Sequence, residues 1–206
     1  MRTGTILSAP SRVDRGGRPA SPCAAVTDPA PVNGIDVDAS RIGGIWWRHI
    51  PPGADALHKH PRAYDNRWQR GSVIDAFYLS DSADTTYAEW YRTLARQRTA
   101  VIPALPFDLV RFEVQIAGVA DLSSVGRLKR AGLPAPRAGT GFPEFQAVGE
   151  RLFASGYAGL VAPTDARLDH LVLCVFRPDV NIAGIAPVLP TTRVIEPPLV
   201  PTGMTT

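Results

Sequence analysis

Residues 109–116, LVRFEVQI, decide how this chain folds, because apolar and polar side chains alternate from Val110 to Ile116. A repeat of two places successive side chains on opposite faces of a β-strand, so that one face is buried and the other meets solvent. The expected buried face carries Val110, Phe112, Val114 and Ile116, and the expected exposed face carries Arg111, Glu113 and Gln115.

The sequence on either side of this strand predicts further short strands and three helices. Aromatic and β-branched residues favour strands at 44–50 (GIWWRHI) and 75–80 (DAFYLS), and the first of these ends at a Pro-Pro-Gly turn. Continuous apolar runs favour strands that are buried on both faces of a sheet. The expected strands are 44–50, 75–80, 109–116, 158–162, 171–176 and 192–195, and the expected helices are 83–98, 123–131 and 144–155.

The helix expected at 83–98 has two chemically different sides. Ser80, Asp81 or Ser82 can cap its N-terminus. Glu89 and Arg92 lie away from the centre of its apolar side. That apolar side follows the spacing i, i+3, i+4, i+7 and consists of Tyr87, Trp90, Tyr91 and Leu94.

Strands and helices follow one another in an irregular order, which favours the α+β class over a doubly wound parallel sheet. We expect a single domain with a mixed central sheet and flanking helices. Residues 1–40 are expected to form a flexible Pro/Gly-rich tail and residues 181–206 a Pro-rich C-terminal segment, because both lack a sustained apolar period. The folded domain is expected at 41–180.

Composition excludes several classes of function. The chain has 206 residues, of which 20% are charged, and its net charge of +3 comes from scattered basic residues, so no direct nucleic-acid partner is expected. No apolar run approaches the roughly 18 residues of a membrane span and no secretory signal is evident, so we expect a cytoplasmic protein without a membrane partner. His58 and His60 lack zinc-site spacing and suit a loop, so no metal is expected.

The common nucleotide-binding and hydrolase motifs are absent. The sequence contains no G-x-G-x-x-G, no Walker A and no G-x-S-x-G, and the Gly-Thr-Gly at 139–141 lies in a Pro-rich loop. Twenty of the 22 basic residues are arginines, a bias that coding preference alone could produce, although guanidinium groups also suit anionic ligands. The residues by themselves therefore indicate an α+β domain that could take an anionic ligand.

Seven short motifs in a fixed order carry a family resemblance. They are WWRHI (46–50), YDNRW (64–68), FYLSD (77–81), YAEW (87–90), DLSS (121–124), FQAVGERL (145–152) and GYAGLVAPTDAR (156–167). Over residues 45–177 the chain resembles the RES-domain family. The resemblance implies a toxin encoded beside an antitoxin with a helix-turn-helix DNA-binding part, and a fold similar to that of ADP-ribosyltransferase toxins. It also implies cleavage of NAD at the nicotinamide–ribose bond, with NAD as substrate, no cofactor, and inorganic phosphate as a possible co-substrate.

The matching positions supply candidate site residues. Glu89 matches the family's glutamate, which would stabilise an oxocarbenium-like ribose, and Arg48 and Arg67 match two arginines that would bind diphosphate or an incoming phosphate. Tyr78 matches an aromatic residue that would cover the nicotinamide. Glu89 and Arg48 are therefore the catalytic candidates, and the substrate-binding candidates are Arg67, Tyr78, His49 and Gln146.

The chain also departs from the family pattern. No serine precedes the helix at 144–155, where Phe142-Pro143-Glu144 stands with Thr140 as the nearest hydroxyl. Thr164 and Asp165 occupy positions where small residues are usual, which we interpret as loop variation. Three functions stay open: a glycohydrolase or phosphorylase of NAD, an ADP-ribosyltransferase acting on a protein, and a catalytically silent binding module.

Overall fold

Strand β3 (Phe107–Asp121) organises the sheet, because three other strands pair with it. The computed structural model describes residues 35–59, 63–137, 141–177 and 182–205. Within β3 the predicted alternation is confirmed, since Val110, Phe112 and Val114 are fully buried while Arg111 and Glu113 are exposed. The strand is longer than predicted at both ends.

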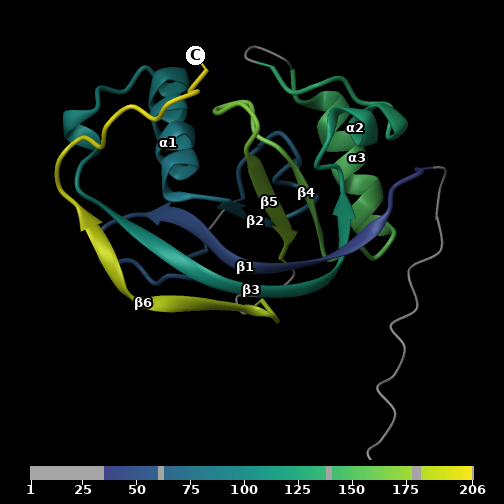
Figure 1. Ribbon diagram of the computed structural model, residues 1–206, viewed down its shortest axis with the longest axis horizontal. Coiled ribbons are helices and arrows are strands. Elements are labelled where there is room, and N and C mark those ends of the chain that lie inside the picture. Colours follow the sequence, from purple (N-terminus) through teal and green to yellow (C-terminus); the bar gives the residue numbers. More distant parts are fainter. Residues whose placement is uncertain (1–34, 60–62, 138–140, 178–181, 206) are drawn as a thin grey trace, which may run out of the picture.

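The other strands complete a mixed sheet (Figure 1). They are β1 (Ala39–Ile50), β2 (Ala76–Ser80), β4 (Gly159–Pro163), β5 (Leu171–Phe176) and β6 (Ile185–Val194). The strand order is β1-β2-β5-β4-β3-β6, and β1 also pairs with β3, so five strands form a closed ring with β6 added outside β3. All pairs are antiparallel except β3–β4.

Both ends of the domain differ from the expected boundaries. β1 begins at Ala39 instead of residue 44, and Ile35 is only 6% exposed, so residues 35–40 belong to the packed structure and not to the expected tail. Residues 1–34 lie outside the described residues. β6 starts well before 192 even though it contains Pro187 and Pro190. An edge strand tolerates proline because its outward N–H groups need no partner in the sheet.

In the described part of the chain, three helices and one 3-10 turn (Ile102–Ala104) flank the strands, with α1 on one side and α2 and α3 together on the other (Figure 1). Helix α1 (Ala83–Gln97) begins after Ser82, whose side chain accepts a hydrogen bond from the Thr85 N–H at 3.1 Å, as the sequence predicts. Helices α2 (Val125–Arg130) and α3 (Pro143–Ala154) match the other two predicted helices. Within the described part of the chain, no helix is long and apolar enough to cross a membrane.

The apolar core has three parts that fix these layers. Phe77, Phe112 and Leu173 belong to the cluster between the strands of the ring. Phe145 and Leu152 of α3 pack with residues of β4 and β5 in a second cluster, and a third lies between α1 and the start of β3. Side chains of β2 alternate between the first two clusters, with Phe77 and Leu79 in one and Ala76 and Tyr78 against the other. The end of β2 and the side of α1 that faces it line a cavity.

Candidate active site

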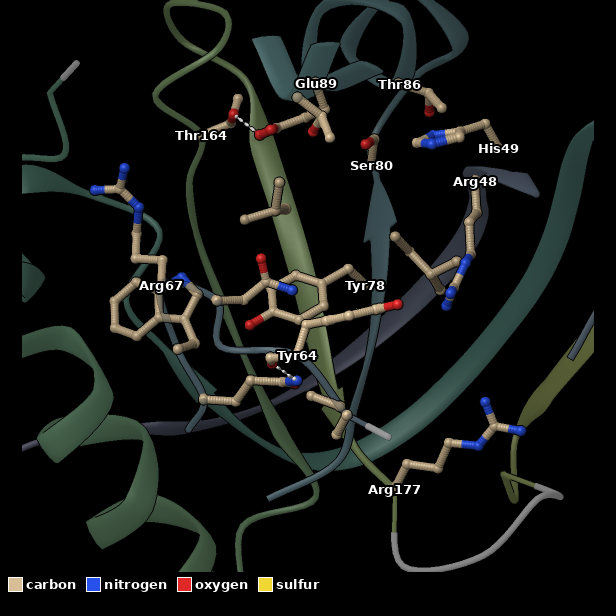
Figure 2. A pocket seen from close by; sticks show the side chains of 18 of the residues that line it. Arg48, His49, Tyr64, Arg67, Tyr78, Ser80, Thr86, Glu89, Thr164 and Arg177 are labelled. Carbon is tan, nitrogen blue, oxygen red and sulfur yellow. Dashed lines mark hydrogen bonds between the residues drawn. The ribbon is translucent and has the colours of Figure 1, made fainter. Parts of the chain in front are cut away.

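A cavity of about 290 Å³ lies between the end of β1, strand β2, helix α1 and the loop after β4. In Figure 2, Arg67 and Arg48 lie on opposite sides of this cavity with Tyr78 between them, and Glu89 lies near Thr164 at one end. Five of the six residues for which the sequence predicts a role line it, namely Glu89, Arg48, Arg67, Tyr78 and His49.

Helix α1 contributes a polar stripe to the cavity. The stripe follows the helical repeat and consists of Thr86, Glu89, Thr93 and Arg96. Another side of the helix packs on β3, where the rings of Trp90 and Phe107 are 4.8 Å apart. The predicted position of Glu89 off the apolar stripe is therefore confirmed, but the polar side faces a cavity instead of open solvent.

Glu89 is held by one hydrogen bond. Its Oε1 accepts from the Thr164 hydroxyl, whose oxygen also accepts from the Ala166 N–H at 3.0 Å. Burial raises the pKa of Glu89, the hydrogen bond from Thr164 opposes this, and the nearby charge of Asp165 raises it further. The charges of Arg96 and Arg92 act in the opposite direction and lower the pKa of Glu89.

Arg48, near the end of β1, has an unsatisfied guanidinium group. Its Cζ lies 4.2 Å from the centre of the Phe77 ring, and its buried Nη1 has no hydrogen-bond partner among the described residues. Burial and the charge of Arg177 lower the pKa of Arg48 to about 10, against an opposing effect of Asp75. Taking a guanidinium group out of water is costly, and an anionic ligand at this end of the cavity would satisfy its unpaired donor.

Arg67 lies on a turn across the cavity from Arg48. Its Nη2 forms an ion pair with Asp165, and its Cζ lies 5.0 Å from the Phe145 ring and 5.6 Å from the Phe142 ring. Burial lowers the pKa of Arg67, and the charge of Asp165 opposes that change. Its Nη1 is buried without a partner among the described residues, so it too retains a donor for a ligand.

The turn that carries Arg67 is fixed by α3. Gln146 donates from Nε2 to the carbonyls of Asn66 at 3.0 Å and Gln69 at 3.2 Å, and it does not line the cavity. A Cβ at Gly149 would come within 2.1 Å of the Trp68 carbonyl oxygen, so only glycine permits this approach. The structure therefore places Gln146 behind the cavity wall, away from the other five residues for which the sequence predicts a role.

Tyr78 and His49 lie in the cavity wall in neutral form. Burial raises the pKa of Tyr78 well above 10. Burial and the neighbouring charge of Arg48 lower the pKa of His49 to about 4, so its imidazole is uncharged at pH 7. His49 also packs edge-on to Phe107, with ring centres 5.9 Å apart. Neither residue competes with the arginines for an anion by charge.

Interpreting Thr164 and Asp165 as loop variation is wrong. Both line the cavity, where Thr164 binds Glu89 and Asp165 binds Arg67. The family pattern shows only that Thr164 and Asp165 differ from the usual residues. Their partners, Glu89 and Arg67, lie 75 and 98 positions earlier in the chain, so the sequence does not show the contacts. Only the fold brings them together. Thr140, the hydroxyl nearest to the expected serine, lies outside the described residues, whereas Phe142 lines the cavity rim.

Arg177 and Arg96 are cavity residues that no sequence signal indicated. Arg177 follows β5 and donates from Nη2 to the Leu57 carbonyl at 2.5 Å, and its Cζ lies 5.5 Å from the same Phe77 ring that carries Arg48. In Figure 2 it lies at the Arg48 side of the cavity. It becomes a neighbour of Arg48 because β2 joins β1 to β5, an order that periodicity cannot predict.

The site combines a carboxylate with several guanidinium groups around an aromatic ring. In the part of the chain that the structure describes, no three His, Cys, Asp or Glu side chains lie together as a metal site requires. A buried carboxylate can stabilise a positive charge that develops on a ligand, while arginines on either side bind its anionic groups. The arrangement suits a ligand that carries anionic groups and also develops a positive charge.

Comparison with known proteins gives the family. In overall fold the chain is similar to a chain in the crystal structure of the M. tuberculosis MbcT-MbcA toxin-antitoxin complex, with a TM-score of 0.64 and 20% sequence identity over 76% of this chain and 87% of the other. No curated protein sequence matches the chain. The RES domain matches residues 45–192, which contain strands β2 to β5, the second half of β1 and every residue that lines the cavity. The chain therefore belongs to the RES domain family.

Proposed function

We propose that this chain is the toxin of a toxin–antitoxin pair and that it cleaves the nicotinamide–ribose bond of NAD. The observation that carries the proposal is the cavity itself, in which a half-buried glutamate lies with two arginines that keep unpaired buried donors. NAD carries both features that such a site would bind: a diphosphate, and a ribose carbon that becomes cationic as nicotinamide leaves.

Each side chain has a defined part in the proposed reaction. Glu89 stabilises the oxocarbenium-like ribose electrostatically, because its carboxylate lies in a cavity where charge interactions are stronger than in bulk water. Arg48 and Arg67 bind the diphosphate or an incoming phosphate through paired N–H donors. The ring of Tyr78, between the two arginines in Figure 2, covers the nicotinamide. The cavity is at the small end of the roughly 300–1,000 Å³ range of ligand pockets, so it receives the reacting end of the dinucleotide.

Neutralisation by an antitoxin is the second part of the proposal. It is supported by membership of the RES domain family and by the similar fold found in the M. tuberculosis toxin–antitoxin complex. The proposed partner is a protein with a helix-turn-helix DNA-binding part that covers the cavity mouth. The acceptor of the ADP-ribosyl group is water in a glycohydrolase and phosphate in a phosphorylase.

The test is to incubate purified chain, free of antitoxin, with NAD and to measure nicotinamide release with and without inorganic phosphate. Release that requires phosphate identifies a phosphorylase, and release without it identifies a glycohydrolase. Release that occurs only when a protein acceptor is added would instead support an ADP-ribosyltransferase. No release under any condition would contradict an enzymatic function and favour a silent binding module.

A further inference from the structure

Asp165 binds three arginines with a single carboxylate oxygen. Its Oδ2 forms ion pairs with Arg67, with Arg92 at 2.8 Å and with Arg96 at 3.4 Å. The Asp165 side chain is only 5% exposed, and Arg67 and Arg92 are buried as well. One negative charge therefore holds three positive charges in the wall beside Glu89.

Glu89 forms no ion pair within the described residues, although these arginines surround it. Arg92 and Arg96 are close enough to lower its pKa, and Arg67 is close enough to be affected by its charge. A carboxylate and a guanidinium that come into direct contact form a charge-assisted hydrogen bond. The guanidinium groups are directed to Asp165 instead, and Glu89 accepts only from the neutral hydroxyl of Thr164.

We propose that Asp165 is a positioning residue that keeps Arg67 and Arg96 bound and so leaves the Glu89 carboxylate unpaired toward the cavity. The inference rests on the proposed function, because it concerns the carboxylate that would face the ribose. An ion-paired glutamate would have part of its charge neutralised and its oxygen lone pairs occupied, so it would stabilise a cationic ribose less well.

The loop that carries Asp165 is itself held in place. The Asp165 carbonyl accepts hydrogen bonds from Arg92 and from the Thr205 hydroxyl, and the Thr205 N–H donates to the Ala166 carbonyl at 2.9 Å. The adjacent Thr164 hydroxyl binds Glu89 while it accepts from Ala166. Two consecutive residues of this loop thus act on the site, since Thr164 holds the Glu89 carboxylate and Asp165 binds the arginines.

The proposal predicts a change in the titration of Glu89. The charged and titratable groups that face it are Arg92 and Arg96 on its own helix, Arg67 on the turn, Asp165 on the loop and Tyr78 on β2. Asp165→Asn removes a like charge and releases arginines that can then pair with Glu89. Both changes favour the ionised form, so the pKa of Glu89 should fall relative to the unaltered protein.

The direct experiment follows the Glu89 carboxyl by 13C NMR as a function of pH, with Glu89→Gln to assign the signal. Asp165→Asn should lower the pKa of Glu89, and Asp165→Glu, which keeps the charge, should restore most of it. Because this readout needs no substrate, it tests Asp165 even if the chain does not cleave NAD. An unchanged Glu89 pKa in Asp165→Asn would overturn the proposal.

Kinetics supply the second readout. In Asp165→Asn, kcat should fall roughly tenfold, equivalent to about one charge-assisted hydrogen bond, and the acid limb of the kcat/KM profile should move to lower pH. The matched control is Asp108→Asn, an equally buried aspartate that pairs with Arg193 outside the cavity and should leave the acid limb in place. A fall in kcat with an unmoved acid limb would mean that Asp165 is only structural.

A second background keeps the test valid if the single variant does not fold. Arg96→Gln removes the most exposed of the three arginines, with 44% of its side chain exposed. When Asp165→Asn is added to this variant, two unpaired arginines remain instead of three, so less positive charge is left without a partner. Asp165→Asn in this background is compared with Arg96→Gln alone. A lower Glu89 pKa in the double variant supports the proposal, and equal pKa values contradict it.

Discussion

Arg48 shows most clearly how a single residue can be built for a ligand. Its guanidinium group is stacked on Phe77 beside Arg177 and has a buried nitrogen with no partner among the described residues. Folding therefore bears a desolvation cost that the contact with Phe77 and the charge of Asp75 offset only in part, since the pKa of Arg48 still falls to about 10. A bound anion would satisfy the donor and offset the repulsion between the two arginines.

Arg48→Ala should weaken NAD binding by roughly 1.5–3 kcal/mol, the usual contribution of a hydrogen bond to a charged group. Arg48→Lys should recover only part of the affinity, because an ammonium group lacks the planar paired donors of a guanidinium. Calorimetric titration with NAD measures both, with Arg111→Ala on the exposed face of β3 as the control. An affinity in Arg48→Ala equal to that of the control would assign Arg48 a structural role.

At the scale of elements, α3 acts on the cavity without entering it. Gln146 holds the carbonyls of the turn that carries Arg67, and Gly149 allows the helix to approach that turn. The sequence matched Gln146 to a family position and so predicted a substrate contact. Position in a motif indicates that a residue is needed, but it does not distinguish a ligand contact from support of the wall.

Gln146→Leu separates these two roles. Loss of two buried hydrogen bonds should lower the free energy of unfolding by roughly 1–3 kcal/mol and speed amide exchange in residues 66–69. KM for NAD should rise because Arg67 is held less firmly. The control is Arg151→Leu on the exposed side of the same helix. Weaker NAD binding without any loss of stability or of exchange protection would show that Gln146 contacts the substrate.

Individual elements could be predicted because their periodicity is local. The alternation in β3, the cap at Ser82 and the stripe on α1 all depend on residues a few positions apart, and all are confirmed. The extent of β6 could not be predicted, because proline is unfavourable in a central strand and tolerated at an edge, and sequence does not show which strand is at the edge.

At the scale of the whole molecule, the cavity exists because the ring of strands closes. β1 pairs with β3 along most of its length and meets β2 at the single register pair Trp47–Ser80, and β2 pairs with β5. This order brings Arg48 of β1, Tyr78 of β2 and Arg177, which follows β5, into the wall of one cavity. A period of two shows which side of a strand is buried but not which strand lies next to it. The family motifs therefore indicated Glu89, Arg48 and Arg67, whereas Asp165 and Arg177 became visible only in the fold.

The C-terminal segment closes the other end of this arrangement. It crosses α1 and the loop after β4, where the carbonyl of Thr202 accepts from Arg167 at 2.9 Å and the carbonyl of Gly203 accepts from the Leu168 N–H at 3.1 Å. Tyr91 of α1 donates to the Pro198 carbonyl. The segment that the sequence describes only as Pro-rich thus fixes the loop that carries Thr164 and Asp165.

A chain that ends after Pro201 should keep the sheet but lose this support. We expect a drop in kcat of roughly tenfold with a small decrease in thermal midpoint, because a misplacement of catalytic groups by about an ångström costs rate far more than it costs stability. Nicotinamide release and thermal unfolding measure the two effects. An active shortened chain with an unchanged kcat would show that residues 202–205 do not position the loop.

The proposed role of the Glu89 carboxylate is to promote cleavage of NAD, and Glu89→Gln is the sharpest test of that role, because the substitution removes charge with little change in volume. The measurement is NAD affinity and nicotinamide release on the same preparation, with Glu113→Gln on the exposed face of β3 as the control. We expect Glu89→Gln to bind NAD with nearly unchanged affinity and to release nicotinamide about 10²–10³-fold more slowly, the usual effect of removing one electrostatic stabiliser. Release at the rate of the control would contradict the proposed role of Glu89.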